Sequence, residues 1–397
     1  MTERNAWGAD TIGVRGGLAR SNFEETAEGL FLTSGFVYDR AEDAEAAFAG
    51  DVERFVYSRR GNPTVAAFEE RLRLLEGAEA CLATATGMSA VFTALGALLA
   101  SGDRVVASRN LFGANVAVLE EVLPRWGVQT VFVDGSDLSQ WKDALAQPTK
   151  AVFFETPSNP MQELVDIEAV SELAHAAGAT VVVDNVFGTP VFSKPMRLGV
   201  DVVVYSATKH IDGQGRVLGG AILGPAEFID EDAAKLARRT GPTMSPFNAW
   251  VLVKGLETLR LRVEQQGRTA LALAELLEKD PRIEQVRYPM LASHPQHELT
   301  KRQMTGGGTV VTLTLKGGRD AVFAFMNSLQ LVDISNNLGD AKSMVTHPAT
   351  TTHHSMKPED RETVGITEGT LRFSVGLEDF DDLRADVEQA LEKAQAR

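Results

Sequence analysis

Residues 201–216 read DVVVYSATKHIDGQGR, an apolar run followed at once by hydroxyl side chains, a lysine and a glycine-rich turn. An unalternated apolar run is typical of a strand that is buried on both faces of a sheet. Lys209, just after this strand, has two interpretations. It is either a solvated loop cation or a nucleophile at the sheet edge where α/β proteins bind ligands. In the second interpretation, Ser206 and Thr208 are placed to hold an anion.

Similar apolar runs recur upstream of this stretch, and helical patterns separate several of them. The runs are RVVAS (104–108), QTVFV (129–133), KAVFFE (150–155) and ATVVVD (179–184). One intervening helical pattern, IEAVSELAHAAG, ends at Gly178, a residue suited to a helix C-cap. Strands that alternate with helices predict an α/β fold whose mostly parallel sheet is covered on both faces.

The chain divides into three parts that differ in composition and hydrophobic pattern. Residues 1–58 are acidic and irregular, and residues 59–255 carry the repeating strand and helix patterns. From residue 256 onward a long charged helix is followed by GGGTVVTLTLKGG (306–318), which alternates strictly. Strict alternation predicts a strand with one exposed face. We therefore expect a second, smaller α+β domain with a half-exposed sheet at residues 256–397.

Composition narrows the class of protein. The chain has 397 residues, of which 44% are hydrophobic and 23% charged, as in an ordinary globular protein large enough for two domains. Its net charge of -15 argues against nucleic-acid binding, so small molecules and other subunits are the expected partners. The single cysteine, Cys81, excludes an intrachain disulfide framework, and no metal site is expected. Because the opening MTERNAWGAD also lacks a signal-peptide pattern, a cytoplasmic location is expected.

Residues 80–100 form an uncharged stretch of roughly bilayer length. Its small residues, its Ser and Thr positions and Gly87 in its middle instead favour a short strand, a turn and a buried helix. The stretch is therefore not expected to span a membrane.

Two chemical groups meet at one edge of the predicted sheet. Asp184 ends the strand at 179–184, and Lys209 follows the strand of residues 201–206 by three positions. Pyridoxal phosphate (PLP) enzymes need this pair, because the lysine carries the cofactor as a Schiff base and the carboxylate keeps the ring nitrogen protonated. Gly87, at a strand end before a helix N-terminus, could admit the phosphate. Taken singly, Gly87 could equally be a turn glycine, and Asp184 could be a helix cap.

Seven segments spread over residues 57–379 carry a resemblance to a known family. The chain resembles the Cys/Met-metabolism group of fold-type I PLP enzymes in YSRRGNPT, ETPSNP, VVVDNVFGTP, SATKHIDG, SPFNAW, HPATTTH and LRFSVGLED. The resemblance implies a large domain with a seven-stranded sheet, a smaller C-terminal domain, and a homotetramer built from two tight dimers. It also implies that PLP is the cofactor and that Lys209 is its Schiff-base residue.

The resemblance assigns further roles residue by residue. Tyr57 and Arg59 match a pair that reaches a neighbouring subunit's phosphate, which would make residues 1–58 an intersubunit arm. Arg372 matches the arginine that binds the substrate α-carboxylate, although by itself it could be a surface arginine. The cofactor contacts implied within the same subunit are Gly87, Met88, Ser206 and Thr208 at the phosphate, Asn159 at the phenolic oxygen, Asp184 at the ring nitrogen, and Phe112 stacked on the ring.

Departures from the relatives indicate the reaction. Phe112 stands where most relatives have tyrosine, so the phenol that assists proton transfer is missing. Ala114 replaces the cysteine of methionine γ-lyases, and Asn336 and Asn337 replace a glutamate and a serine of cystathionine γ-lyases. The forms KHIDGQGRVLGG and SNNLGDAKSMVTHPATTTH are most similar to the O-succinylhomoserine sulfhydrylases.

This similarity implies a γ-replacement in methionine biosynthesis, in which O-succinylhomoserine and sulfide give homocysteine and succinate. O-acetylhomoserine sulfhydrylase and cystathionine γ-synthase remain alternatives, and a γ-lyase or a non-catalytic PLP-binding protein is less favoured. The buried distal carboxylate of a succinyl ester needs a cation. Arg216 and Arg109 are the candidates, although each could instead be a solvated arginine or part of an intersubunit ion pair. Asn337 is expected to contact the substrate.

Overall fold

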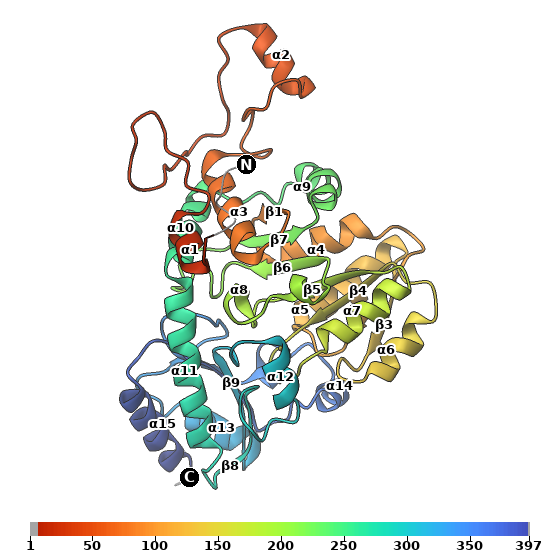
Figure 1. Cartoon of the computed structure of the whole chain (residues 1–397). Coiled ribbons are helices and arrows are strands. Elements are labelled where there is room, and N and C mark those ends of the chain that lie inside the picture. Colours follow the sequence, from red (N-terminus) through yellow and green to blue (C-terminus); the bar gives the residue numbers. More distant parts are fainter. Residues whose placement is uncertain (1–6, 396–397) are drawn as a thin grey trace.

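The computed structural model describes residues 7–395, and its centre is a seven-stranded sheet (Figure 1). The strand order is β1-β7-β6-β5-β4-β2-β3, and neighbouring strands from β3 to β6 run parallel. Only β7 runs against the others, so the predicted α/β class and mostly parallel sheet are confirmed. The strands are β1 (Ala80–Thr84), β2 (Arg104–Ser108), β3 (Gln129–Val133), β4 (Ala151–Glu155), β5 (Thr180–Asp184), β6 (Val202–Ser206) and β7 (Gly220–Gly224).

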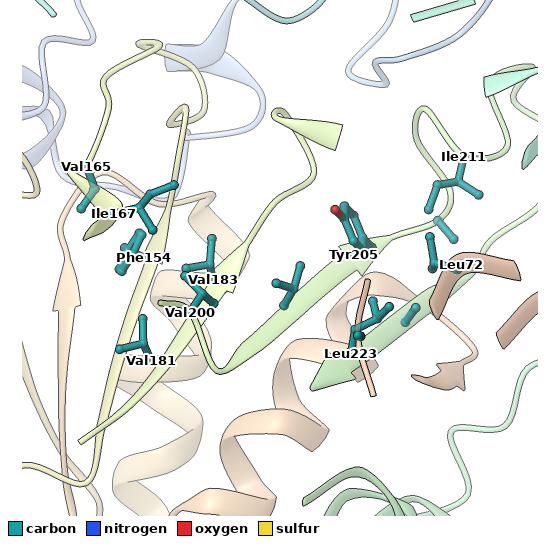
Figure 2. Packing of buried hydrophobic residues seen from close by; sticks show 14 of the residues in the cluster. Leu72, Phe154, Val165, Ile167, Val181, Val183, Val200, Tyr205, Ile211 and Leu223 are labelled. Carbon is teal, nitrogen blue, oxygen red and sulfur yellow. The ribbon is translucent and has the colours of Figure 1, made fainter. Parts of the chain in front are cut away.

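Helices cover both faces of this sheet, which explains why its strands read as unbroken apolar runs. One core contains Val181, Val183 and Tyr205 with residues of α3 and α7, and Figure 2 shows part of it. The intervening residues Val182 and Val204 belong to a second core with α4. The covering helices are α3 (Pro63–Glu76), α6 (Leu138–Leu145), α7 (Ile167–Ala176) and α10 (Pro246–Glu257) on the first side, and α4 (Gly87–Leu98) and α5 (Gly113–Ala117) on the second.

The uncharged stretch at residues 80–100 folds as predicted, into β1, a turn and helix α4. Thr86 caps the helix, because its hydroxyl accepts the backbone N–H of Ser89. Within residues 7–395 no helix combines the length and the apolar character that crossing a bilayer requires.

A second sheet of five strands follows helix α11 (Leu259–Leu277), with the order β10-β11-β12-β9-β8. Its own core packs against α11, α13 and α15. Helix α11 takes part in two cores, because Val263 packs with the large sheet, whereas Ala270 and later residues pack with the second sheet. The elements are β8 (Ile283–Arg287), β9 (Val310–Leu315), β10 (Asp333–Ile334), β11 (Met344–Thr346), β12 (Thr370–Ser374), α12 (His297–Gln303), α13 (Gly318–Met326), α14 (Pro358–Thr363) and α15 (Phe380–Gln395).

The prediction of a half-exposed second sheet is wrong for β9, which is buried on both faces. Val311 and Leu313 pack into the core of the second sheet. On the other face, the hydroxyl of Thr312 donates to the carbonyl of Pro160 in the large domain. The polar residues of the alternating pattern in β9 therefore lie on the face that contacts backbone of the large domain. On the adjacent strand, Arg372 pairs in register with Thr312.

The N-terminal part of the chain is only partly anchored. Helix α1 (Ala9–Arg15) packs on α3 and α10, whereas the segment that contains α2 (Ala41–Ala49) extends away from the rest of the chain (Figure 1). Phe23 and Val37 of this segment are about 90% exposed. The remaining helical segments are α8 (Thr189–Phe192), α9 (Ala234–Thr240), and 3-10 or π-helical turns at Val118–Val122, Leu123–Trp126, Pro195–Leu198, Phe228–Ala233 and Pro348–Thr350.

Candidate active site

A cavity of about 1140 Å³ lies at the C-terminal ends of β4, β5 and β6, and the second sheet contributes part of its wall. Ligands of open α/β sheets bind at this edge. The structure brings nine of the predicted site residues together here: Gly87, Met88, Phe112, Asn159, Asp184, Ser206, Thr208, Lys209 and Arg372. The cavity therefore joins strand ends that lie far apart in the sequence.

One end of the cavity is suited to a phosphate group. Gly87 begins helix α4 and faces the end of β6, where a Cβ atom added to it would lie 2.5 Å from the Cβ of Ser206. Only glycine therefore leaves this cradle open. The helix N-terminus presents backbone N–H groups and a favourable dipole. The Thr208 hydroxyl, fixed by the N–H of Gly219 at 3.1 Å, lies at the same end.

Asp184 is buried with neutral partners. One of its oxygens accepts the backbone N–H of Val186 at 3.1 Å, and the other accepts the side-chain amide of Asn115 at 3.2 Å. Burial raises the pKa of Asp184 to about 6, and both hydrogen bonds oppose that rise. A protonated pyridine nitrogen would provide the positive charge that these neutral partners lack, so the carboxylate fits the predicted cofactor.

Lys209 lies inside the cavity rather than in solvent. Its Nζ donates to Oδ1 of Asn337 at 2.7 Å, as expected if Asn337 belongs to the site. Burial, together with the positive charge of Arg372, lowers the pKa of Lys209 to about 8. A larger fraction of this lysine is therefore the nucleophilic neutral amine near neutral pH than for an exposed lysine. The interpretation as a solvated loop cation is wrong.

Arg372 reaches the cavity from β12 of the second sheet and is almost fully buried. Its guanidinium donates to Oδ1 of Asn159 at 3.1 Å and to the carbonyls of Asn336 and Asn337 at 2.8 and 3.1 Å. Its Nε has no partner among the described residues. Burial lowers the pKa of Arg372 to about 10, and Glu155 opposes this shift. A guanidinium with neutral acceptors and a free buried N–H is suited to a carboxylate.

Two residues that line the cavity were not predicted as site residues from the sequence. Asn115, on the first turn of α5, holds Asp184, and Glu155 ends β4 beside Asp184 in the sheet register. The signal for Glu155 was present, because KAVFFE ends in an acid in the same way as ATVVVD. Asn115 carried no comparable signal, since its role depends on how α5 packs.

Five predicted residues do not line the cavity: Asn337 is bonded to Lys209 and Arg372, which do line it, whereas the other four lie farther away. Arg216 is bound to Asp212, with Nε 2.9 Å from Oδ1, and exposed Arg109 donates to the carbonyl of Phe132. The structure therefore does not bring either proposed acyl-tail arginine into the site. Tyr57 lies at the end of the N-terminal arm and Arg59 just after it, with the Arg59 guanidinium 5.4 Å from the centroid of the Tyr57 ring.

Comparison with known proteins identifies the family. Residues 10–392 match the sequence profile of the Cys/Met metabolism PLP-dependent enzymes. The O-succinylhomoserine sulfhydrylase of Mycobacterium tuberculosis is 64% identical to this chain, over 96% of this chain and 95% of the relative. The O-succinylhomoserine sulfhydrylase of Pseudomonas aeruginosa is 50% identical to this chain, over 96% of this chain and 94% of the relative. A Campylobacter jejuni metY structure that carries N'-pyridoxyl-lysine-5'-monophosphate matches with a TM-score of 0.93 and 31% identity, over 97% of this chain and 100% of that one.

These matches cover nearly the whole length of the chain and of each relative. They agree with the cavity, in which a lysine, a buried carboxylate and a phosphate cradle face one another. The residues present fit PLP, and the chain belongs to the Cys/Met metabolism family of PLP-dependent enzymes.

Proposed function

We propose that the protein is an O-succinylhomoserine sulfhydrylase, which forms homocysteine and succinate from O-succinylhomoserine and sulfide in methionine biosynthesis. The supporting observation in the site is the position of Asn337. Its side chain accepts a hydrogen bond from Lys209 and its carbonyl accepts one from Arg372, so it joins the nucleophile to the expected carboxylate-binding group. Asn337 belongs to the segment in which this chain is most similar to the sulfhydrylases.

In the proposed mechanism, each residue has a distinct task. Bound PLP supplies the electron sink that stabilises negative charge next to the amino group of the substrate. Asp184 holds the ring nitrogen in its protonated form, and Arg372 orients the α-carboxylate of the substrate. Lys209 takes the proton from Cα and later returns one. A proton leaves Cβ as the C–O bond at Cγ breaks and succinate departs. Hydrosulfide then forms the new C–S bond at Cγ, Cβ regains a proton, and the return of a proton to Cα completes homocysteine.

Steady-state kinetics test this assignment directly. We expect kcat/KM to be highest for O-succinylhomoserine with sulfide, when both acyl esters are compared with both sulfide and cysteine. Arg109→Ala and Arg216→Ala serve as controls, and we expect them to leave the ratio of the two esters unchanged, because neither arginine lines the cavity. Preference for the acetyl ester or for cysteine would overturn the assignment. Ammonia release from methionine would indicate a lyase.

We propose that the protein is a cytoplasmic homotetramer, a dimer of dimers, in which residues 1–58 form an arm that reaches the neighbouring subunit. The arm extends away from its own chain (Figure 1), and its apolar side chains are exposed where a partner could cover them. Tyr57 and Arg59 lie outside the cavity of their own subunit. To contact the phosphate of a neighbour, the Arg59 guanidinium would exchange its hydrogen bond to the carbonyl of Arg238, at 2.5 Å, for one to a phosphate oxygen.

A mixing experiment tests the shared site. Arg59→Ala subunits and Lys209→Ala subunits should each be nearly inactive, but each hybrid dimer should recover about half of the native activity. The reason is that one of the two sites then receives both intact groups. Activity is measured after subunit exchange, and mixing is verified with differently tagged subunits. Absence of recovery in verified hybrids would exclude the shared site.

Gly87→Ala should weaken the binding of PLP by at least about tenfold, because the new Cβ would press against Ser206 at the phosphate end. The dissociation constant is measured by reconstituting the apo protein. Gly96→Ala is the matched control in the same helix, since the nearest atom to its Cβ would be the flexible end of Leu236 at 3.3 Å, with the ring of Phe92 at ordinary contact distance. Equal affinities in the two variants would contradict a phosphate cradle at Gly87.

Attachment of PLP to the apo protein should accelerate as pH rises and level off above about pH 8. Only the neutral amine of Lys209 reacts, and its lowered pKa of about 8 sets the midpoint. The rate is followed from the appearance of the visible absorption band between pH 6 and 10. A free lysine derivative, measured in parallel, corrects for titration of PLP itself. A corrected midpoint near that of an exposed lysine would show that the pKa of Lys209 is not lowered.

A further inference from the structure

Glu155 is a buried acid in the cavity that the proposed mechanism does not use. It ends β4 and pairs in register with Asp184 at the end of β5. In-register residues of parallel strands point to the same face, and Phe153 and Val182, two positions earlier on each strand, both belong to the core beneath α4 and α5. Glu155 and Asp184 therefore project side by side toward α5, which contains Asn115 and directly follows Phe112.

The contacts of Glu155 connect it to a segment at the cofactor site. Its Oε2 accepts a hydrogen bond from the backbone N–H of Phe112, the residue just before α5, at 2.8 Å. Glu155 itself is only 3% exposed. Phe112 has no side-chain cap of its own at this helix start. Glu155 therefore holds the start of the segment that carries Phe112 at the cavity wall.

The charges around Glu155 decide its protonation state. Burial raises the pKa of Glu155 well above its ordinary value, and Asp184 raises it further, while the N–H of Phe112 and the charge of Arg372 oppose the rise. Two adjacent buried carboxyl groups do not both ionise readily. Asp184 has the smaller pKa shift and receives two N–H donors, so it is the member of the pair that takes the negative charge.

We propose that Glu155 is a positioning residue that remains an uncharged acid, fixes Phe112 at the wall of the cofactor site, and leaves Asp184 as the single negative charge of the pair. This role is independent of which ester or sulfur donor the enzyme uses, because it concerns the bound cofactor alone.

Two substitutions separate the shape of the acid from its charge. Glu155→Gln keeps an acceptor for the N–H of Phe112 and is neutral, so PLP affinity should stay within about twofold of wild type. The pH midpoint of the visible PLP band should also be unchanged. Glu155→Leu removes the acceptor and releases the ring of Phe112 from its position, so the dissociation constant of PLP should rise about tenfold, the scale of one lost aromatic stacking contact. The circular dichroism of the PLP band should weaken as the ring of Phe112 loses its fixed position.

Control variants identify the route of the effect. Glu69 also accepts a backbone N–H, that of Ala83 at 2.7 Å, but it does not line the cavity, so Glu69→Leu should lower the melting temperature without altering the PLP band. In a Phe112→Ala background, Glu155→Leu should change PLP affinity by less than about threefold, because the ring that it positions is already gone. Should Glu155→Leu fail to fold, Glu155→Asp replaces it, since the shorter acid cannot reach Phe112.

Three results would overturn the proposal. Equal damage by Glu155→Gln and Glu155→Leu would mean that the negative charge matters. Native affinity and native circular dichroism in Glu155→Leu would mean that the acid positions nothing. An undiminished effect of Glu155→Leu in the Phe112→Ala background would mean that it acts on some other group.

Discussion

Lys209→Ala should abolish the visible PLP absorption band and lower kcat by about 10³-fold or more. The substitution removes both the amine that holds the cofactor covalently and the base that moves the substrate proton, and proton transfer alone contributes roughly 10²–10⁴-fold. The native protein should be yellow, and borohydride should fix PLP to the peptide that contains Lys209. Absorption spectra, peptide mass analysis and steady-state rates give the three measurements.

Lys194 provides a matched control for this experiment. Burial also lowers the pKa of Lys194, but its amine donates to the carbonyl of Leu75 and lies outside the cavity. Lys194→Ala should therefore keep the yellow band while it lowers stability. A native band in Lys209→Ala, or borohydride labelling at Lys194, would refute the assignment of Lys209.

Arg372→Ala should lower kcat/KM for the amino-acid substrate by about 10²–10³-fold. Hydrogen bonds between charged groups contribute roughly 1.5–3 kcal/mol each, and a guanidinium can offer two to one carboxylate. Arg372→Lys keeps the charge without the forked geometry, so it should recover only part of the loss. PLP should still bind to both variants with its normal absorption band, which separates the binding of substrate from the binding of cofactor.

Arg262 is the control for a buried arginine that binds backbone carbonyls and one threonine hydroxyl, that of Thr258. Its guanidinium donates to the carbonyls of His210 and Gly255 at 2.9 and 2.8 Å, outside the cavity. Arg262→Lys should reduce the melting temperature and leave KM unchanged. A similar rise of KM in both arginine variants would indicate that Arg372 serves the fold rather than the substrate.

The parts of the fold that could be predicted are those in which the pattern of apolar residues directly reflects which faces are buried. Strands covered on both faces must be apolar throughout, so β2 to β6 could be recognised as runs. Parallel strands end at one edge, so Asp184 and Lys209 could be placed together. The alternation in β9 was misleading because a pattern shows which face is polar but not what covers it, and Thr312 is covered by backbone of the large domain.

The two arginine predictions show a second limit of the sequence. Arg216 is only seven positions from Lys209, but Asp212, four positions before it, binds its guanidinium outside the cavity. Arg372 is far from Lys209 along the chain, and the two lie in one cavity because the second sheet packs there. Proximity along the chain therefore does not predict proximity in a site built from several elements.

Helix α11 has a consequence for how the molecule unfolds. Its first half is packed into the core of the large sheet and its second half into the core of the other sheet, so loss of either core exposes apolar side chains of one continuous helix. The two halves of the protein are thereby linked into a cooperative unit. A partly melted state that keeps only the large sheet would retain Lys209 and Asp184 but lose the strand that carries Arg372. Such a state could bind the cofactor but not the carboxylate of an amino acid. The reactive cofactor and the arginine that binds the substrate therefore occur together only in the fully folded chain.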